Sequence, residues 1–132
     1  MPNPLLSICI PTYNRPELLK RTLESVVTAS DRLEILVTDN STDDRVEGVT
    51  REFMSSAPCD WEYHRNDFPR DKSNLELMVL NLNRGVSLAK GRYIYIIHDD
   101  DFMADGAIEM LARPSRSLSS ISMAPSAMKS SS

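Results

Sequence analysis

Three consecutive aspartates directly follow an apolar stretch of the chain. Residues 93 to 97 are aliphatic or aromatic, and His98, Asp99, Asp100 and Asp101 come next. Adjacent carboxylates repel one another, and unpaired charge at the end of a buried strand costs several kcal/mol, roughly, unless a cation neutralises it. Oxygen ligands in a row suit Mg²⁺ or Mn²⁺, which link carboxylates to phosphate groups. The cluster therefore predicts a metal site for a phosphorylated ligand, with a solvated acidic turn that caps a following helix as the alternative.

The composition is typical of one globular domain. The chain has 132 residues, of which 41% are hydrophobic and 26% charged, and this length is enough for a sizeable core. Its net charge of −4 provides no basic surface for nucleic acid. The two cysteines form no disulfide framework, and Cys9 lies in an apolar strand pattern as a small core residue. Because neither a signal peptide nor an apolar run of about 18 residues is visible, a cytoplasmic location is expected.

Strand and helix patterns alternate along the chain. Short apolar or alternating runs at residues 5 to 10, 33 to 38, 61 to 64 and 93 to 97 predict four strands, and Pro11 is expected to end the first. Between these runs, apolar residues recur at helical spacing, which predicts helices. This order predicts an α/β fold with a mostly parallel sheet and helices on both faces. Ligands of such sheets bind at the carboxyl ends of the strands.

Two capping-box patterns mark where helices begin. Asn14 with Glu17 predicts the start of the first helix, and Pro16 suits its first turn. Ser73 with Glu76 predicts the start of the longest helix. Its apolar residues recur at helical spacing: Leu75, Met78, Val79, Leu82, Val86 and Ala89. A further helix is expected from about residue 105.

The last part of the chain differs from the rest. Nine of the 18 residues from 115 to 132 are serine and none is acidic, so the stretch cannot bury enough apolar surface to offset its chain entropy. We therefore expect a domain over residues 1–112 and a disordered serine-rich tail over 113–132. The abrupt change in composition after a helical pattern suggests a chain that is cut short or read in a foreign frame. A natural serine-rich tail is the alternative.

Three motifs together resemble a known family. Pro11-Thr12-Tyr13-Asn14-Arg15 follows the first strand, Thr38-Asp39-Asn40-Ser41-Thr42-Asp43 follows the second, and Ala89-Lys90-Gly91-Arg92-Tyr93-Ile94 leads into the aspartates. In this order they resemble the N-terminal, donor-binding half of family 2 glycosyltransferases with the GT-A fold, over residues 4 to 112. The longer stretch Ser7-Ile8-Cys9-Ile10-Pro11-Thr12-Tyr13-Asn14-Arg15 is most similar to bacterial enzymes that build surface polysaccharide, including abequosyltransferase-like members.

The resemblance implies roles for the loops after the first two strands. Pro11, Thr12 and Tyr13 would line the nucleotide base, with Tyr13 stacking on it or closing the pocket. Asp39 would accept a hydrogen bond from a ring N–H of the base. The residue types leave two structural alternatives open, namely ordinary packing of Tyr13 at a strand end and a turn-forming role for Asp39.

The resemblance also implies roles for charged residues further along. Asp99 would face the ribose, and Asp100 would hold Mn²⁺ or Mg²⁺, which neutralises the leaving nucleotide. Lys72, or Arg70 near it, would lie close to the base or the phosphates, and a solvated loop charge is the alternative. His98 stands where many relatives carry the first aspartate of the motif, and we interpret it as a strand-end residue.

The implied function is that of the donor half of a glycosyltransferase. Its partners would be a nucleotide-diphosphate sugar, with UDP favoured and CDP or dTDP as alternatives, and an acceptor glycan or lipid-linked sugar at the inner face of the membrane. The catalytic base of an inverting transfer stays unknown, because no residue here can be given that role. A truncated nucleotide-binding module without catalytic activity is the alternative. The lack of glycine after the first strand disfavours a dinucleotide-binding dehydrogenase.

Overall fold

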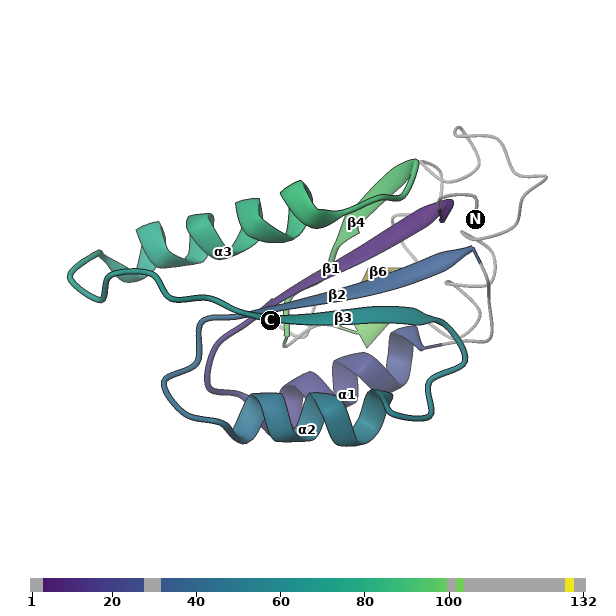
Figure 1. The fold of residues 1–132 in the computed structure, drawn as a ribbon, viewed down its shortest axis with the longest axis horizontal. Helices are drawn as coiled ribbons and strands as arrows, with labels where there is room; N and C mark the ends of the chain where they lie inside the picture. Colours follow the sequence, from purple (N-terminus) through teal and green to yellow (C-terminus); the bar gives the residue numbers. More distant parts are fainter. Residues whose placement is uncertain (1–3, 28–31, 100–101, 104–127, 130–132) are drawn as a thin grey trace.

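The computed structural model describes residues 4–27, 32–99, 102–103 and 128–129. Four parallel strands form its main sheet in the order β3-β2-β1-β4 (Figure 1). These strands are β1 (Leu6–Thr12), β2 (Leu33–Asp39), β3 (Asp60–Arg65) and β4 (Tyr93–Ile96). Two short strands, β5 (Phe102–Met103) and β6 (Met128–Lys129), pair antiparallel in a separate sheet.

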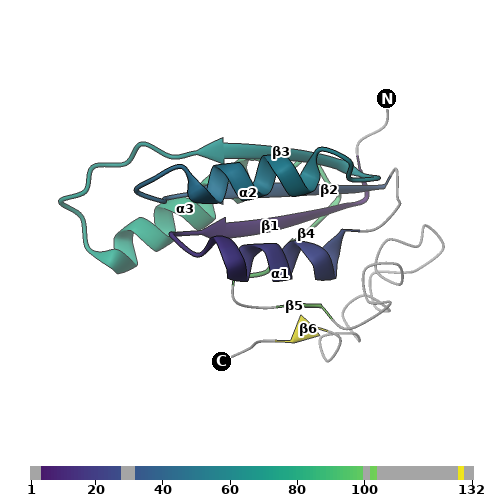
Figure 2. The same ribbon diagram turned by 90° about the horizontal axis from the view of Figure 1, so that it is seen from below.

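Helices cover both faces of the main sheet. Helices α1 (Pro16–Val26) and α2 (Arg45–Met54) lie on one face and α3 (Asn74–Leu88) lies on the other (Figures 1 and 2). The strand order explains this, because β1, β2 and β3 progress in one direction and β4 returns to the far side of β1. Right-handed crossovers place the helix of a reversed connection on the opposite face. The predicted α/β class with a parallel sheet is confirmed.

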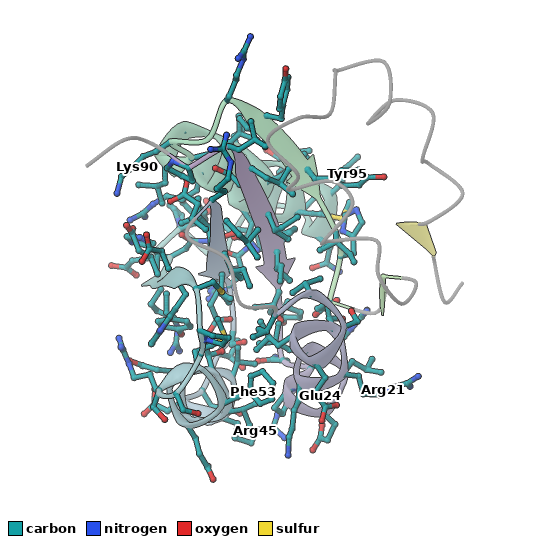
Figure 3. All side chains as sticks on the ribbon, turned by 90° about the vertical axis from the view of Figure 1, so that its right-hand side faces the viewer. Arg21, Glu24, Arg45, Phe53, Lys90 and Tyr95 are labelled. Carbon is teal, nitrogen blue, oxygen red and sulfur yellow. The ribbon has the colours of Figure 1, made fainter. Side chains whose placement is uncertain are left out.

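The core lies mainly between the sheet and helices α1 and α2. Every residue of β1 and β2 is buried, which is expected for central strands of a parallel sheet. Figure 3 shows the side-chain layer that fills this space, with Phe53 between the two helices. The buried apolar cluster includes Ile8, Ile10, Leu19, Leu23, Ile35 and Val37.

Pro11 does not end the first strand as predicted, because β1 continues to Thr12. The N–H of Ile97 donates to the carbonyl of Cys9, whereas the N–H of Asn40 donates to the carbonyl of Thr12. Backbone groups of odd-numbered β1 residues therefore point toward β4. The β1–β4 pairing stops at Cys9, so the missing N–H of Pro11 falls beyond the last hydrogen bond.

The predicted capping box of Asn14 and Glu17 is wrong. The N-cap of α1 is Arg15, without a side-chain capping bond, although Pro16 does occupy the first turn. Asn14 instead adopts a left-handed backbone with φ of 53°, and its side chain pairs with Thr42 in the loop after β2. Its amide therefore joins two loops rather than capping the helix.

Helix α3 begins as predicted but packs through an unexpected face. Ser73 and Glu76 form the predicted capping box. The residues that α3 buries are Leu77, Asn81 and Gly85. The apolar residues that indicated the helix lie largely exposed: Leu75, Met78, Val79 and Val86. The face toward the sheet is selected by small and polar contacts with β1 and β2, since Gly85 lies against Cys9 and Thr38.

The Lys90-Gly91 motif is a structural feature at the amino edge of the sheet. The backbone N–H of Gly91 donates to Ser7 Oγ over 2.8 Å, and that of Lys90 donates to Glu34 Oε2 over 2.6 Å. Ser7 Oγ also donates to the same carboxylate oxygen over 2.5 Å. A Cβ on residue 91 would lie 2.5 Å from Ser7 Oγ, so the close approach of β4 to β1 requires glycine.

Several predictions fall on other parts of the chain. Asp100 lies outside the described residues, and so does the helix expected from about residue 105. Of the expected tail over 113–132, the structure describes only Met128–Lys129. Among the residues that are described, no helix is long and apolar enough to cross a membrane.

Candidate nucleotide site

The sheet changes strand order between β1 and β4, and the carboxyl ends of these strands form a topological switch point. Open α/β sheets place their ligands in the crevice at such a point. Thr12 ends β1 and is the register partner of Asp39, which ends β2. Asp99 follows β4 at the same edge and accepts a hydrogen bond from Thr12. The structure thus brings three of the predicted site residues to one sheet edge.

Asp99 is held by donors from the first loop. Its side chain is only 9% exposed. Thr12 Oγ1 donates to Oδ2 over 3.0 Å, the backbone N–H of Tyr13 donates to the same oxygen over 3.4 Å, and the Arg15 guanidinium pairs with Oδ1 at 3.4 Å. The hydroxyl of Thr22 in α1 fixes the Asp99 carbonyl over 2.9 Å. The carboxylate is therefore oriented before any ligand arrives, and Arg15 offsets part of its charge.

Asp39 is more enclosed than the family resemblance implies. It is 0% exposed. Its Oδ1 accepts from the backbone N–H of Ser41 over 2.8 Å, and its Oδ2 accepts from the hydroxyl of Tyr63. Burial raises the pKa of Tyr63, and the hydrogen bond to Asp39 raises it further, so the phenol stays a donor. A base could therefore contact Asp39 only if a group that now encloses it, such as the Tyr63 hydroxyl, moved.

A shallow groove of about 430 Å³ borders the loop after β2. Its lining residues are Ser41, Thr42, Asp44, Arg65, Asn66, Asp67 and Arg70. Arg70 donates to the carbonyl of Asn40 over 2.7 Å, so it holds this loop in place. Lys72 lies exposed just before the cap of α3. Of the two basic residues that the resemblance offers, Arg70 is the one that lines the groove.

The remaining predicted residues differ in accessibility. Pro11 is buried within β1, whereas Tyr13 is 47% exposed and can contact a planar ligand. His98 is exposed at the end of β4. A second cavity of about 490 Å³ lies between the carboxyl ends of α1 and α2, and it shares no lining residue with the groove. Apolar and charged side chains line that cavity, among them Phe53, Lys20 and Glu52, and no residue at the carboxyl end of a strand contributes to it.

The sequence interpretation missed Arg15 and Tyr63 as partners of the two aspartates. It also missed three buried asparagines, Asn40, Asn66 and Asn81, beneath the strand ends. Arg15 lies in the motif after the first strand, next to the start of the helix, and this position could have indicated that it reaches an aspartate at the same edge. Tyr63 lies in the alternating pattern of a predicted strand, and no local pattern indicates that its hydroxyl donates to Asp39.

The parallel strand order, the helices on both faces and the aspartates at the carboxyl edge define a doubly wound α/β fold. Comparison with known families agrees with this geometry. Residues 7–125 match the model of glycosyl transferase family 2, and the chain belongs to this family.

Curated relatives include enzymes of several organisms. The chain is 31% identical to an uncharacterised glycosyltransferase of Methanocaldococcus jannaschii, over 83% of this chain and 36% of that protein. It is 31% identical to an abequosyltransferase of Salmonella typhimurium, over 81% and 31%. It is 26% identical to a GalNAc(5)-diNAcBac-PP-undecaprenol beta-1,3-glucosyltransferase of Campylobacter jejuni, over 82% and 33%. The chain thus spans about a third of the length of these relatives.

Solved structures share the fold at low identity. S. aureus TarS in complex with UDP superposes with a TM-score of 0.59 at 19% identity, covering 75% of this chain and 28% of that one. A second TarS structure gives a TM-score of 0.60 at 18% identity, covering 80% and 30%. These likenesses support the GT-A architecture.

Proposed function

We propose that this chain binds a nucleoside-diphosphate sugar as the donor part of a glycosyltransferase. The observation that carries the proposal is the meeting of Thr12, Asp39 and Asp99 at the switch point of a family 2 glycosyltransferase fold. UDP is the favoured nucleotide, and the UDP complex of TarS supports this choice. CDP and dTDP are the alternatives.

The proposal assigns each part of the nucleotide to a group at this edge. The exposed ring of Tyr13 stacks on the base, and Asp99 accepts from the ribose hydroxyls by exchanging one of its present donors. Asp39 accepts from a ring N–H of the base, in exchange for the Tyr63 hydroxyl. An ionised carboxylate accepts from the ring N–H of uracil but repels the ring nitrogen of cytosine, which favours uridine nucleotides.

Mn²⁺ or Mg²⁺ is the cofactor in this proposal. Asp99 already accepts hydrogen bonds at both carboxylate oxygens, so the neighbouring Asp100 is the better metal ligand. Carboxylate oxygens suit these hard cations, and the bound metal would neutralise charge on the diphosphate. The inverting course of the transfer belongs to the same proposal.

The acceptor is proposed to be a glycan or a lipid-linked sugar, in polysaccharide or glycolipid synthesis. The names of the Campylobacter and Salmonella relatives support this choice. A lipid-linked acceptor would bring the protein to the inner face of the cytoplasmic membrane as a peripheral protein. These assignments concern a whole enzyme, and this chain spans about a third of the length of its relatives.

Calorimetry with UDP tests donor and metal binding. We expect tighter binding of UDP with Mn²⁺ or Mg²⁺ than with a chelator, and loss of that metal dependence in Asp100→Ala. Asp39→Ala should weaken binding without abolishing it, because one hydrogen bond to a charged group contributes about 1.5–3 kcal/mol. Glu24→Ala is the matched control, since this exposed carboxylate lies near the end of α1, away from the carboxyl edge of the sheet. Equal affinity with metal and with chelator would refute the metal assignment.

A nucleotide-binding module without transfer activity is the second candidate. Its supporting observation is that both described edge aspartates, Asp39 and Asp99, are buried and accept hydrogen bonds at both carboxylate oxygens. Neither is therefore placed to take a proton from an acceptor hydroxyl, and we assign the catalytic base to no described residue. A product assay with UDP-sugars and glycan acceptors separates the two candidates. Metal-dependent transfer by residues 1–132 would exclude the second.

A further inference from the structure

Three buried asparagines form one hydrogen-bonded group beneath the strand ends. Asn40, Asn66 and Asn81 are each less than 5% exposed. Asn66 Nδ2 donates to Asn40 Oδ1 over 2.8 Å and to Asn81 Oδ1 over 2.7 Å, so both of its amide hydrogens are used. These residues come from three places: the end of β2, the end of β3 and the middle of α3.

The outer partners of this asparagine triad are also satisfied. Asn40 Nδ2 donates to the carbonyl of Leu77 over 2.8 Å, and Arg84 donates to Asn66 Oδ1 over 3.4 Å. A buried amide without partners costs free energy, whereas a fully bonded group has one favoured arrangement. The triad therefore fixes α3 relative to the ends of β2 and β3.

Asn81 extends this group to the nucleotide edge. Its Nδ2 donates to the carbonyl of Thr12 over 3.3 Å, and the backbone N–H of Asn40 donates to the same carbonyl over 3.0 Å. The hydroxyl of Thr12 then donates to Asp99 over 3.0 Å. Thr12 thus links the side-chain amide of Asn81 to Asp99, the aspartate that is proposed to contact the ribose.

We propose that Asn81 is a positioning residue for nucleotide binding. From α3 it fixes the backbone of Thr12, and the fixed backbone aims the Thr12 hydroxyl at Asp99. This inference rests on the proposed function, since it adds a residue behind the same site. A stabilising role alone would require only the bonds of Asn81 to Asn66 and within α3, whereas the bond to Thr12 reaches the site.

The test is a double-mutant cycle with Asn81→Asp and Thr12→Val. Asn81→Asp keeps the shape and the acceptor for Asn66 but replaces the donor to Thr12 with an oxygen. Thr12→Val removes the hydroxyl that reaches Asp99. We expect each change to weaken UDP binding with Mn²⁺ by about 10-fold, which is the size expected for one buried hydrogen bond. If Asn81 acts through Thr12, the double variant should lose far less than the product of the two losses.

Thr50→Val is the matched control. Its hydroxyl is buried and donates to the carbonyl of Val46 within α2, so the change removes a buried hydrogen bond away from the edge. It should lower the melting temperature and leave the Kd for UDP unchanged. Asn81→Ser, which is too short to bridge Asn66 and Thr12, serves in place of Asn81→Asp if that variant does not fold, and the same loss is expected.

Two outcomes would overturn the inference in different ways. If wild-type protein binds UDP and the Asn81 variants bind it equally well, or if the two losses multiply in full, Asn81 is a stabilising residue only. If wild-type protein itself does not bind UDP with or without metal, the proposed function falls and this inference falls with it.

Discussion

Gly91→Ala is the substitution whose effect the structure determines most closely. Gly91 begins the turn into β4 and lies against β1 at the amino edge of the sheet. A Cβ at this position would lie 2.5 Å from Ser7 Oγ, 2.7 Å from Ser7 N and 3.0 Å from the carbonyl carbon of Leu6. Two of these three atoms belong to the backbone of a central strand, so no side-chain rotation relieves the contact.

The magnitude follows from the displacement that the methyl group requires. An ordinary contact begins near 3.4 Å, so residue 91 and the Ser7 backbone must separate by about 0.7 Å. Overpacking of this kind costs about 1–3 kcal/mol. The same movement weakens the 2.8 Å bond from Gly91 N–H to Ser7 Oγ, which contributes about 0.5–1.5 kcal/mol. We therefore expect Gly91→Ala to lower the free energy of unfolding by about 1.5–4.5 kcal/mol.

Urea denaturation followed by circular dichroism measures this loss. Gly48→Ala is the control within the same chain, because Gly48 lies in α2 and a Cβ there meets nothing within 4 Å. Alanine in the interior of a helix should stabilise the protein by about 0.5–1 kcal/mol. The two variants should therefore differ in sign. If Gly91→Ala is as stable as Gly48→Ala, the close approach of β4 to β1 is wrong, and with it the reason for glycine in this motif.

Two further predictions concern burial. Burial, and then the nearby Glu34, raise the pKa of the Cys9 thiol to about 11, so about one thiol in a thousand is ionised at pH 8. Iodoacetamide at pH 8 should therefore modify the half-buried Cys59 first, and peptide mass spectrometry that finds Cys9 labelled equally fast in folded protein would contradict this. Val79 is 45% exposed and Leu77 only 9%, so Val79→Lys should change the free energy of unfolding by less than about 0.5 kcal/mol, whereas Leu77→Lys should unfold much of the protein. Equal urea midpoints for the two variants would show that α3 packs through another face.

The order of elements was predictable because it depends on local patterns. The buried strands of a parallel sheet are nearly continuous apolar runs, and the run over residues 33 to 38, interrupted by Glu34, predicts β2 to within one residue. The cap of α3 was predictable for the same reason, since both bonds of the capping box join Ser73 and Glu76, which are three residues apart in the chain. Strand order and handedness rules then place the ends of β1, β2 and β4 at one edge, and with them Thr12, Asp39 and Asp99.

Contacts between distant segments decided what the local patterns did not show. The apolar stripe of α3 suggested its buried face, but the sheet surface opposite it carries the small and polar residues Cys9 and Thr38, against which Gly85 fits. Asn14 matched a helix cap, yet a partner 28 residues away, Thr42, engages its amide.

The site shows the same division. The hydrophobic pattern of the chain indicates which aspartates reach the carboxyl edge, because Asp39 and Asp99 each lie just after an apolar run. Packing between distant segments sets what surrounds them: Tyr63 beside Asp39, Arg15 beside Asp99, and Asn81 behind Thr12. The reason is physical. The position of a residue along a strand follows from hydrophobic periodicity, whereas a hydrogen-bond partner depends on which chain segments pack together, and that information is spread over the whole sequence.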